Sequence, residues 1–430
     1  MGVNGGQPQV LFEGIPYPFL SSKNLIWLPA YQNFELLNFP SSAWWGPSAA
    51  MGAVQIRLPE LTSTSRLEIG GWGGLNSIWG GEAGFENSRL SLGGVFQHGA
   101  SDSFNSIDAF NFILGSQLIA DDSFELRTGF LATQWFGSDN WYSFFGSMKW
   151  KYADFQSLEL KPFIQFADLN GVAVKEFGSD LNYHFIMGGF IESQLGGGMS
   201  QDDFSNESVT PPKNNNKEYI QNSDVIDALG DFKINTTFRL DFSNVMRSAF
   251  STSIGSQYRL GDFSILGDYS KTVDPLTLSD VLQGDFGFRY QPVDFYYLTC
   301  KLETEMLEGI WWTGGRIKTQ WFPEDKFFGL FRKVQLGIEG RILGESSGDQ
   351  YFFDTVARLQ FSIFEPLTFW FVGHELSNQY FYADGGMDCF IAEQTKFYIS
   401  FENIGNYPNS WPDLTTPKGR VAWLGMETGL

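Results

Sequence analysis

The feature that most constrains this chain is an alternation of apolar and polar residues that recurs from about Ser63 to the C-terminus. It is clearest over residues 231–243, where every second residue belongs to one mostly apolar face. That face consists of Phe232, Ile234, Thr236, Phe238, Leu240 and Phe242. The positions between them are polar or charged, as at Lys233 and Arg239. A period of two is the period of a β-strand that has one apolar face.

The same alternation recurs in residues 334–342, 357–363 and 396–402, and Gly, Asp, Asn and Ser clusters separate such segments. Many of the segments are about ten residues long, which is the length of a tilted membrane-spanning strand, whereas strands of soluble proteins are typically about five or six residues long. We count on the order of twenty strands after Ser63, which is within the range of large outer-membrane barrels. The pattern predicts an all-β chain.

Alternation alone is also typical of a soluble antiparallel sandwich, so the position of the aromatic residues matters. Tryptophans gather near the ends of the segments, as at Trp135, Trp141, Trp311 and Trp321. Membrane barrels carry such aromatic girdles at both interfaces. No stretch has the roughly 18 consecutive apolar residues of a spanning helix. We therefore favour a transmembrane β-barrel, and a soluble all-β glycan-binding protein remains an alternative.

Charge excludes one class of partner. The 430 residues include 28 Lys and Arg against 49 Asp and Glu, a formal net charge of −21. A nucleic-acid binder holds phosphates with clustered basic residues, and the sequence has no basic stripe or tail. The chain is therefore not expected to bind nucleic acid.

Residues typical of catalysis are scarce. The three histidines, His98, His184 and His374, stand alone, and no nucleophile elbow or phosphate-binding loop occurs. Cys300 and Cys389 lack the spacing of a zinc site, and whether they pair stays open. We expect no enzymatic activity, no cofactor and no metal site.

One long segment, Gly196 to Asp224, is strongly polar and includes two adjacent prolines and three adjacent asparagines. Such a composition cannot bury an apolar core. The sequence predicts a long loop here. In a barrel with short periplasmic turns, this loop would be extracellular.

The first sixty residues differ from the rest, because they are rich in proline and irregular. Their motifs resemble the second half of the plug domain of TonB-dependent outer-membrane receptors. The matching residues are Glu13, Gly14 and Pro16 in a first turn, Leu28 and Pro29 in a second, and Gly46, Pro47, Ser48 and Gly52 around a third. Residues 401–407 and 419–425 also resemble the last two strands of that family.

The resemblance implies a partial plug in residues 1–60 and a transmembrane antiparallel barrel of about 20 to 22 strands in residues 61–430. It also implies a receptor in the outer membrane of a Gram-negative-type bacterium that takes up a siderophore, vitamin or oligosaccharide. Outer-membrane lipid, a small nutrient ligand and the TonB-ExbB-ExbD system would be its partners. Tyr17, Phe19 and Trp27 are the candidate ligand contacts from the plug loops.

Two expectations concern the start of the chain. Gly2 to Gly6 align with the middle of the family's plug, so a TonB box, the first half of the plug and a signal peptide would lie upstream of Met1. We expect the chain to be an N-terminally truncated receptor. With only half a plug, a passive porin-like channel is the alternative within the membrane-barrel class.

Overall fold

The structure is a computed structural model. It describes residues 9–16, 33–37, 53–58, 61, 65–74, 79–98, 108–135, 140–153, 155–169, 172–206, 209–228, 231–243, 249–273, 280–307, 309–323, 332–348, 350–364, 366–376, 380–392, 395–402, 404 and 421–429. Within these ranges, no helix is long and apolar enough to cross a membrane.

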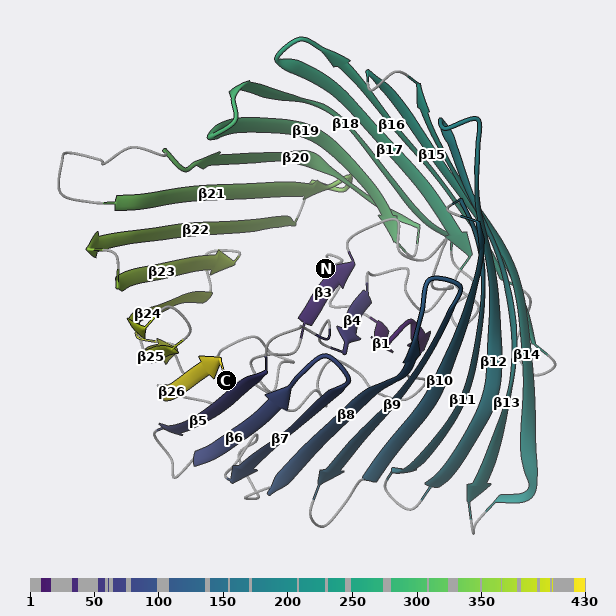
Figure 1. Cartoon of the computed structure of the whole chain (residues 1–430). Helices are drawn as coiled ribbons and strands as arrows, with labels where there is room; N and C mark the ends of the chain where they lie inside the picture. The colour runs from purple at the N-terminus through teal and green to yellow at the C-terminus, as the bar shows by residue number, and fades with distance from the viewer. Residues whose placement is uncertain are drawn as a thin grey trace.

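Twenty-two strands, β5 to β26, form one closed barrel (Figure 1). Each strand pairs antiparallel with its neighbours in the chain, and β26 pairs with β5 to close the ring. The strands are β5 (Arg66–Gly74), β6 (Trp79–Glu86), β7 (Leu90–His98), β8 (Ala109–Ala120), β9 (Phe124–Trp135), β10 (Asn140–Ala153), β11 (Gln156–Leu169), β12 (Val172–Met187), β13 (Ile191–Asn206), β14 (Val209–Ala228), β15 (Phe232–Ser243), β16 (Ala249–Leu260), β17 (Phe263–Val273), β18 (Asp280–Val293), β19 (Tyr296–Leu307), β20 (Ile310–Trp321), β21 (Arg332–Glu345), β22 (Tyr351–Phe364), β23 (Leu367–Leu376), β24 (Tyr380–Ala392), β25 (Thr395–Glu402) and β26 (Val421–Gly429). The predicted barrel of 20 to 22 strands is confirmed.

A second, four-stranded sheet lies inside the barrel (Figure 1). Its strands are β1 (Gln9–Phe12), β2 (Ile15–Pro16), β3 (Asn33–Leu37) and β4 (Ala53–Arg57), in the order β2-β1-β4-β3. β1 and β2 form a hairpin whose two-residue turn, Glu13 and Gly14, has positive φ angles of 51° and 84°. Two positive φ values in a two-residue loop define the turn type whose twist matches that of the flanking strands.

The two faces of the barrel wall follow the sequence alternation. In β15 the apolar set from Phe232 to Phe242 faces outward, and Phe238 is 40% exposed. The alternate residue Arg239 faces the lumen and is buried. A closed barrel leaves no strand edge unpaired, so the backbone hydrogen bonds are satisfied within the wall and the outer face can be apolar.

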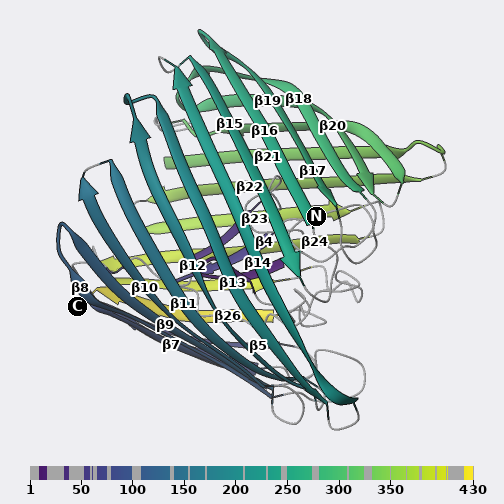
Figure 2. The ribbon, with the colours of Figure 1, turned by 90° about the vertical axis from the view of Figure 1, so that its right-hand side faces the viewer.

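The prediction of a long loop from Gly196 to Asp224 is wrong. The segment forms most of β13 and β14, of 16 and 20 residues, which pair from Ile191 with Ile226 to Asn206 with Val209. Figure 2 shows these strands inclined to the barrel axis, with the β13–β14 hairpin among the longest of the wall. Cross-strand pairing satisfies the backbone whatever the side chains are, so a polar strand is stable once its neighbours fix it.

Turns at one end of the barrel are short. At the β8–β9 turn, the Asp121 carboxylate accepts hydrogen bonds from the backbone N–H groups of Ser123 and Phe124 and from the Ser123 hydroxyl. These donors hold the pKa of Asp121 below its usual range.

Cys300 and Cys389 lie on β19 and β24 and form no disulfide.

Candidate functional site: the barrel lumen

The four-stranded sheet contacts one sector of the inner wall. Three of its side chains, Phe12, Ile15 and Ile56, are fully or almost fully buried in one apolar cluster. The wall supplies Ile113, Leu131, Trp141, Phe145 and Phe163, which come from β8, β9, β10 and β11. The Phe12 and Phe145 rings meet edge to face, with their centroids 5.3 Å apart. The small sheet therefore buries the apolar side chains that this part of the wall points into the lumen.

Polar contacts around Glu13 fix the same sheet. The Lys161 ammonium on β11 donates a hydrogen bond to the Glu13 carbonyl oxygen at 2.8 Å. The Glu13 carboxylate accepts the N–H of Leu58 at 2.5 Å, and the Glu13 N–H donates to the carbonyl of Ile56 at 2.9 Å. A carboxylate in the turn thus links β1 to the end of β4, and the wall contacts the backbone of that turn.

Next to this sector, a buried polar network centres on Arg239. Its guanidinium donates to the Asp241 carboxylate at 2.9 and 3.0 Å and to the Gln221 side-chain oxygen at 3.0 Å. It also lies over the Tyr219 ring, 3.8 Å from the centroid. The Tyr219 hydroxyl in turn donates to Asp180 at 2.7 Å. The network joins β12, β14 and β15.

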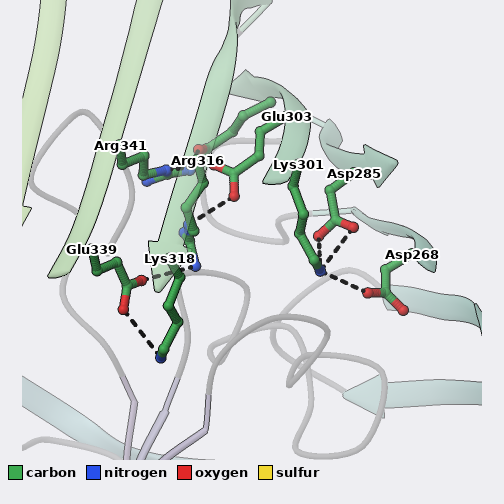
Figure 3. Close-up of polar contacts among 9 residues, drawn as sticks. Asp268, Asp285, Lys301, Glu303, Arg316, Lys318, Glu339 and Arg341 are labelled. Atoms are coloured by element: carbon green, nitrogen blue, oxygen red, sulfur yellow. Dashed lines mark hydrogen bonds and ion pairs between the residues drawn. The ribbon is translucent and has the colours of Figure 1, made fainter. Parts of the chain in front are cut away.

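A ladder of ion pairs covers the inner wall from β17 to β21 (Figure 3). Lys301 lies between two aspartates, 3.0 Å from Asp285 and 3.4 Å from Asp268. Glu303 lies between two arginines, 2.8 Å from Arg316 and 2.6 Å from Arg341.

The ladder continues at its edges. Lys318 pairs with Glu339 at 3.1 Å, and Glu305 lies 3.4 Å from Arg341. Glu303 and Glu305 are nearly buried at the side chain, whereas Lys318 is 47% exposed. The sector is therefore polar and open to solvent in part, unlike the apolar sector that the small sheet covers.

Cross-strand register brings these charges together. Lys301 pairs with Arg316 and with Gly287, and Arg316 pairs with Arg341. Like charges directly opposite each other are destabilising unless counter-ions intervene. Here Glu303, two residues along β19 from Lys301, reaches both arginines. Within the described residues, no cluster of His, Cys, Asp or Glu has the arrangement of a metal site.

Few of the residues predicted as a site can be placed. Glu13, Gly14 and Pro16 form the β1–β2 hairpin described above. The other predicted residues lie outside the described residues. These are Leu28, Pro29, Gly46, Pro47, Ser48 and Gly52 of the plug motif and Tyr17, Phe19 and Trp27 of the ligand contacts.

The lumen networks were not predicted as sites, although the sequence carries their signal. The polar face of each alternating segment contains them, for example Arg239 and Asp241 in 231–243 and Glu339 and Arg341 in 334–342. Their partners lie on neighbouring strands, and the pairing register decides which charges meet.

The comparisons with known proteins agree with this architecture. No protein-family model and no curated protein sequence matches the chain. Solved structures match over its whole length. The siderophore receptor PirA from Pseudomonas aeruginosa superposes with a TM-score of 0.78 at 11% identity, covering 100% of this chain and 91% of that one. The chain has the fold of a siderophore receptor.

Two further structures of this fold align almost as fully. The ferric-catecholate import receptor Fiu from E. coli K12 has a TM-score of 0.74 at 10% identity, covering 99% of this chain and 90% of that one. PirA from Acinetobacter baumannii has a TM-score of 0.73 at 10% identity, covering 99% and 91%. The siderophore-receptor fold is thus shared at low sequence identity, and these neighbours are transport receptors by description.

Proposed function

We propose that this chain is an outer-membrane uptake receptor of the TonB-dependent type, with residues 1–60 acting as a partial plug in the lumen of the barrel formed by residues 61–430. The observation that carries the proposal is the combination of a closed 22-stranded barrel with a separate sheet packed inside it. A 22-stranded barrel is wide enough to need such a plug.

The outer face supports a membrane location. Large apolar side chains such as Phe286, Leu302 and Ile317 are 62%, 71% and 56% exposed. Monomeric soluble proteins rarely expose such a continuous apolar surface. A bilayer around the barrel would cover it, and the closed wall leaves no backbone group to be satisfied by lipid.

The first candidate ligand is a ferric siderophore, because the solved structures that share this fold include a siderophore receptor and a ferric-catecholate import receptor. A vitamin or an oligosaccharide is the next candidate. The lumen would bind and orient such a solute through the charged and aromatic side chains of its wall, and no covalent chemistry is required of the protein. Energy would come from TonB pulling on the plug.

The test uses cells that lack their own siderophore receptors. The chain is expressed in them behind a signal peptide, a TonB box and the first plug half of a known siderophore receptor, which are the segments expected upstream of Met1, and accumulation of ⁵⁵Fe-siderophores is measured with and without a protonophore. Protonophore-sensitive accumulation of at least one siderophore supports the proposal. If the protonophore leaves accumulation unchanged, uptake is not energised. If the barrel inserts but accumulates no siderophore, vitamin or oligosaccharide tried, the receptor proposal is contradicted.

A further inference from the structure

The outer face of the barrel carries a hollow that the alternation does not explain. It crosses the middle of strands β18 to β20, is bounded by Ile265 near one end of β17 and Phe353 near one end of β22, and has a volume of about 810 Å³. Its rim consists of Phe286, Phe288, Leu302, Ile317, Ile342 and Phe353. These side chains face away from the lumen, on the opposite face from the ion-pair ladder.

Small residues make the hollow. Outward positions on β20 and β21 are occupied by Gly315 and Gly340, next to larger outward neighbours. Leu302 pairs with Gly315, and Ile317 pairs with Gly340, so a large side chain stands beside each glycine. A Cβ added at Gly340 would meet only the Thr355 hydroxyl, at 3.8 Å. The outer surface of the wall is therefore recessed at Gly340, and a larger side chain would fit there.

The charged residues of these strands do not reach into the hollow with their charges. Lys301, Arg316 and Arg341 contribute to its lining, but their charged groups pair in the lumen, Lys301 with Asp285 and both arginines with Glu303 (Figure 3). What remains on the outside is aliphatic and aromatic. Such a surface has no polar group that could hydrogen-bond a lipid headgroup. It can pack against a hydrocarbon chain.

Aromatic residues locate the hollow along the membrane normal. Tyr290, Tyr296 and Trp321 lie near one end of β18, β19 and β20, and Trp311 and Tyr351 lie near the other end of β20 and β22. Aromatic girdles mark the two interfaces of a membrane barrel. The hollow lies between them and therefore at the level of the hydrocarbon, a placement that rests on the membrane location proposed above.

From this position we infer that the hollow is a binding site for one acyl chain of a membrane phospholipid. Water is absent at this depth, and an empty hollow would forfeit the dispersion contacts of every side chain around it. The surrounding bilayer supplies hydrocarbon chains at this level, and the hollow is partly open. An acyl chain seated against several aromatic and aliphatic side chains exchanges more slowly than lipid along the rest of the wall.

The experiment compares three forms of the full chain, purified from membranes in a mild detergent and analysed by native mass spectrometry. Gly340→Leu fills the hollow. Gly146→Leu is the matched control, because Gly146 also faces outward, on β10, and a Cβ there would meet only Pro162, at 3.8 Å. Phe353→Ala removes one side of the rim and guards against a filling variant that fails to fold. Heat-modifiable migration in gels establishes that each barrel is folded.

We expect retained phospholipid on the natural chain and on Gly146→Leu. The retained fraction should fall roughly tenfold in Gly340→Leu and also fall in Phe353→Ala, the change expected for losing about two buried methylene contacts. Equal retention in folded Gly340→Leu and the natural chain would overturn the site. A dimer of the natural chain that Gly340→Leu dissociates would also overturn it, because a second copy would then cover the hollow.

Failure of the site is distinguishable from failure of the receptor proposal. If the chain stays soluble and monomeric without detergent and shows no heat-modifiable migration, the membrane location itself is wrong. If the barrel inserts and the cells accumulate siderophore, but Gly340→Leu retains as much phospholipid as the natural chain, only the acyl-chain site is wrong.

Discussion

Phe238 and Arg239 are neighbours in β15, yet their side chains face different surroundings. Phe238 faces outward, 40% exposed, and packs against Phe250 of the next strand with ring centroids 5.3 Å apart. Arg239 faces the lumen and is buried in the network with Tyr219, Asp241 and Gln221. The cost of a substitution depends on which of these surroundings it changes.

We expect Phe238→Arg to destabilise the inserted barrel by about 2 to 4 kcal/mol if residue 238 lies near the midplane, because a guanidinium must then face hydrocarbon. The measurement is the urea midpoint of reversible unfolding from phospholipid vesicles. Phe238→Leu is the control, since it keeps the face apolar and should cost much less. An unchanged midpoint for Phe238→Arg would mean that this face does not contact lipid.

Arg239→Gln looks harmless from the sequence, because position 239 belongs to the polar face. The structure changes that expectation. Glutamine removes the charge that pairs with Asp241 and the cation over the ring of Tyr219, whose hydroxyl donates to Asp180. Removing one partner of a buried ion pair costs several kcal/mol, and the partial exposure of Asp241 reduces this to about 2 to 3 kcal/mol.

The same vesicle unfolding measurement tests Arg239→Gln, with Arg239→Lys beside it. Lysine keeps the charge but cannot form the two-pronged contact with Asp241, so its midpoint should fall between those of the natural chain and the glutamine variant. The explanation fails if the lysine and glutamine variants unfold together at the natural midpoint.

At the scale of elements, glycines in the wall make room for rings on the next strand. A Cβ at Gly178 would lie 2.6 Å from the Phe163 ring, and one at Gly386 would lie 2.6 Å from the Trp370 ring. At the closing seam between β25, β26 and β5, the Tyr398 ring occupies the space beside Gly425, and its hydroxyl donates to Glu82 at 3.0 Å. Glycine is therefore required at these positions by the neighbouring ring.

We expect Gly425→Ala to destabilise the barrel by about 1 to 3 kcal/mol, because the added methyl would overlap the Tyr398 ring. Gly73→Ala is the matched control on β5 at the same seam, since a Cβ there meets nothing within 4 Å. The measurement is the temperature at which the folded band disappears in gels. A double variant, Gly425→Ala with Tyr398→Ser, should regain part of the loss, and equal melting of the two alanine variants would contradict the packing argument.

The strands themselves were predictable, and their pairing was less so. A period of two with ten-residue spacing specifies strands such as β15 and β25 and assigns their faces. It missed β13 and β14, because residues 201–206 and 209–217 show no regular apolar face in the sequence, and pairing with neighbouring strands places them in the wall. The lumen networks depend on register and on side chains from three or more strands, which no local pattern specifies.

At the scale of the whole molecule, the apolar contact between the small sheet and the wall suggests a test of the plug. Ile56→Asp places a charge in the cluster of Phe12, Phe145 and Phe163 and should release the sheet from β8 to β11. We expect the single-barrel conductance in planar bilayers to rise, as it should when residues 2–58 are deleted.

Ile56→Val is the control for this measurement, because it keeps the apolar contact and should leave the conductance low. The natural chain should conduct little. A large steady conductance from the natural chain would instead favour the porin-like alternative, and identical traces for the natural chain and for the chain without residues 2–58 would mean that the sheet does not obstruct the lumen.

The pairing of β26 with β5 has a consequence for how the molecule is made. Val421 pairs with Gly74 and Gly429 with Arg66, so the contact that closes the ring joins segments about 350 residues apart, and its loop-closure cost is about 5 kcal/mol. Until the last strand is in place, β5 presents an open row of backbone donors and acceptors. Inside a bilayer such an edge has no water to satisfy it. In the membrane location proposed above, we therefore expect the edge of β5 to need another partner during assembly until the nine-residue strand β26 pairs with it.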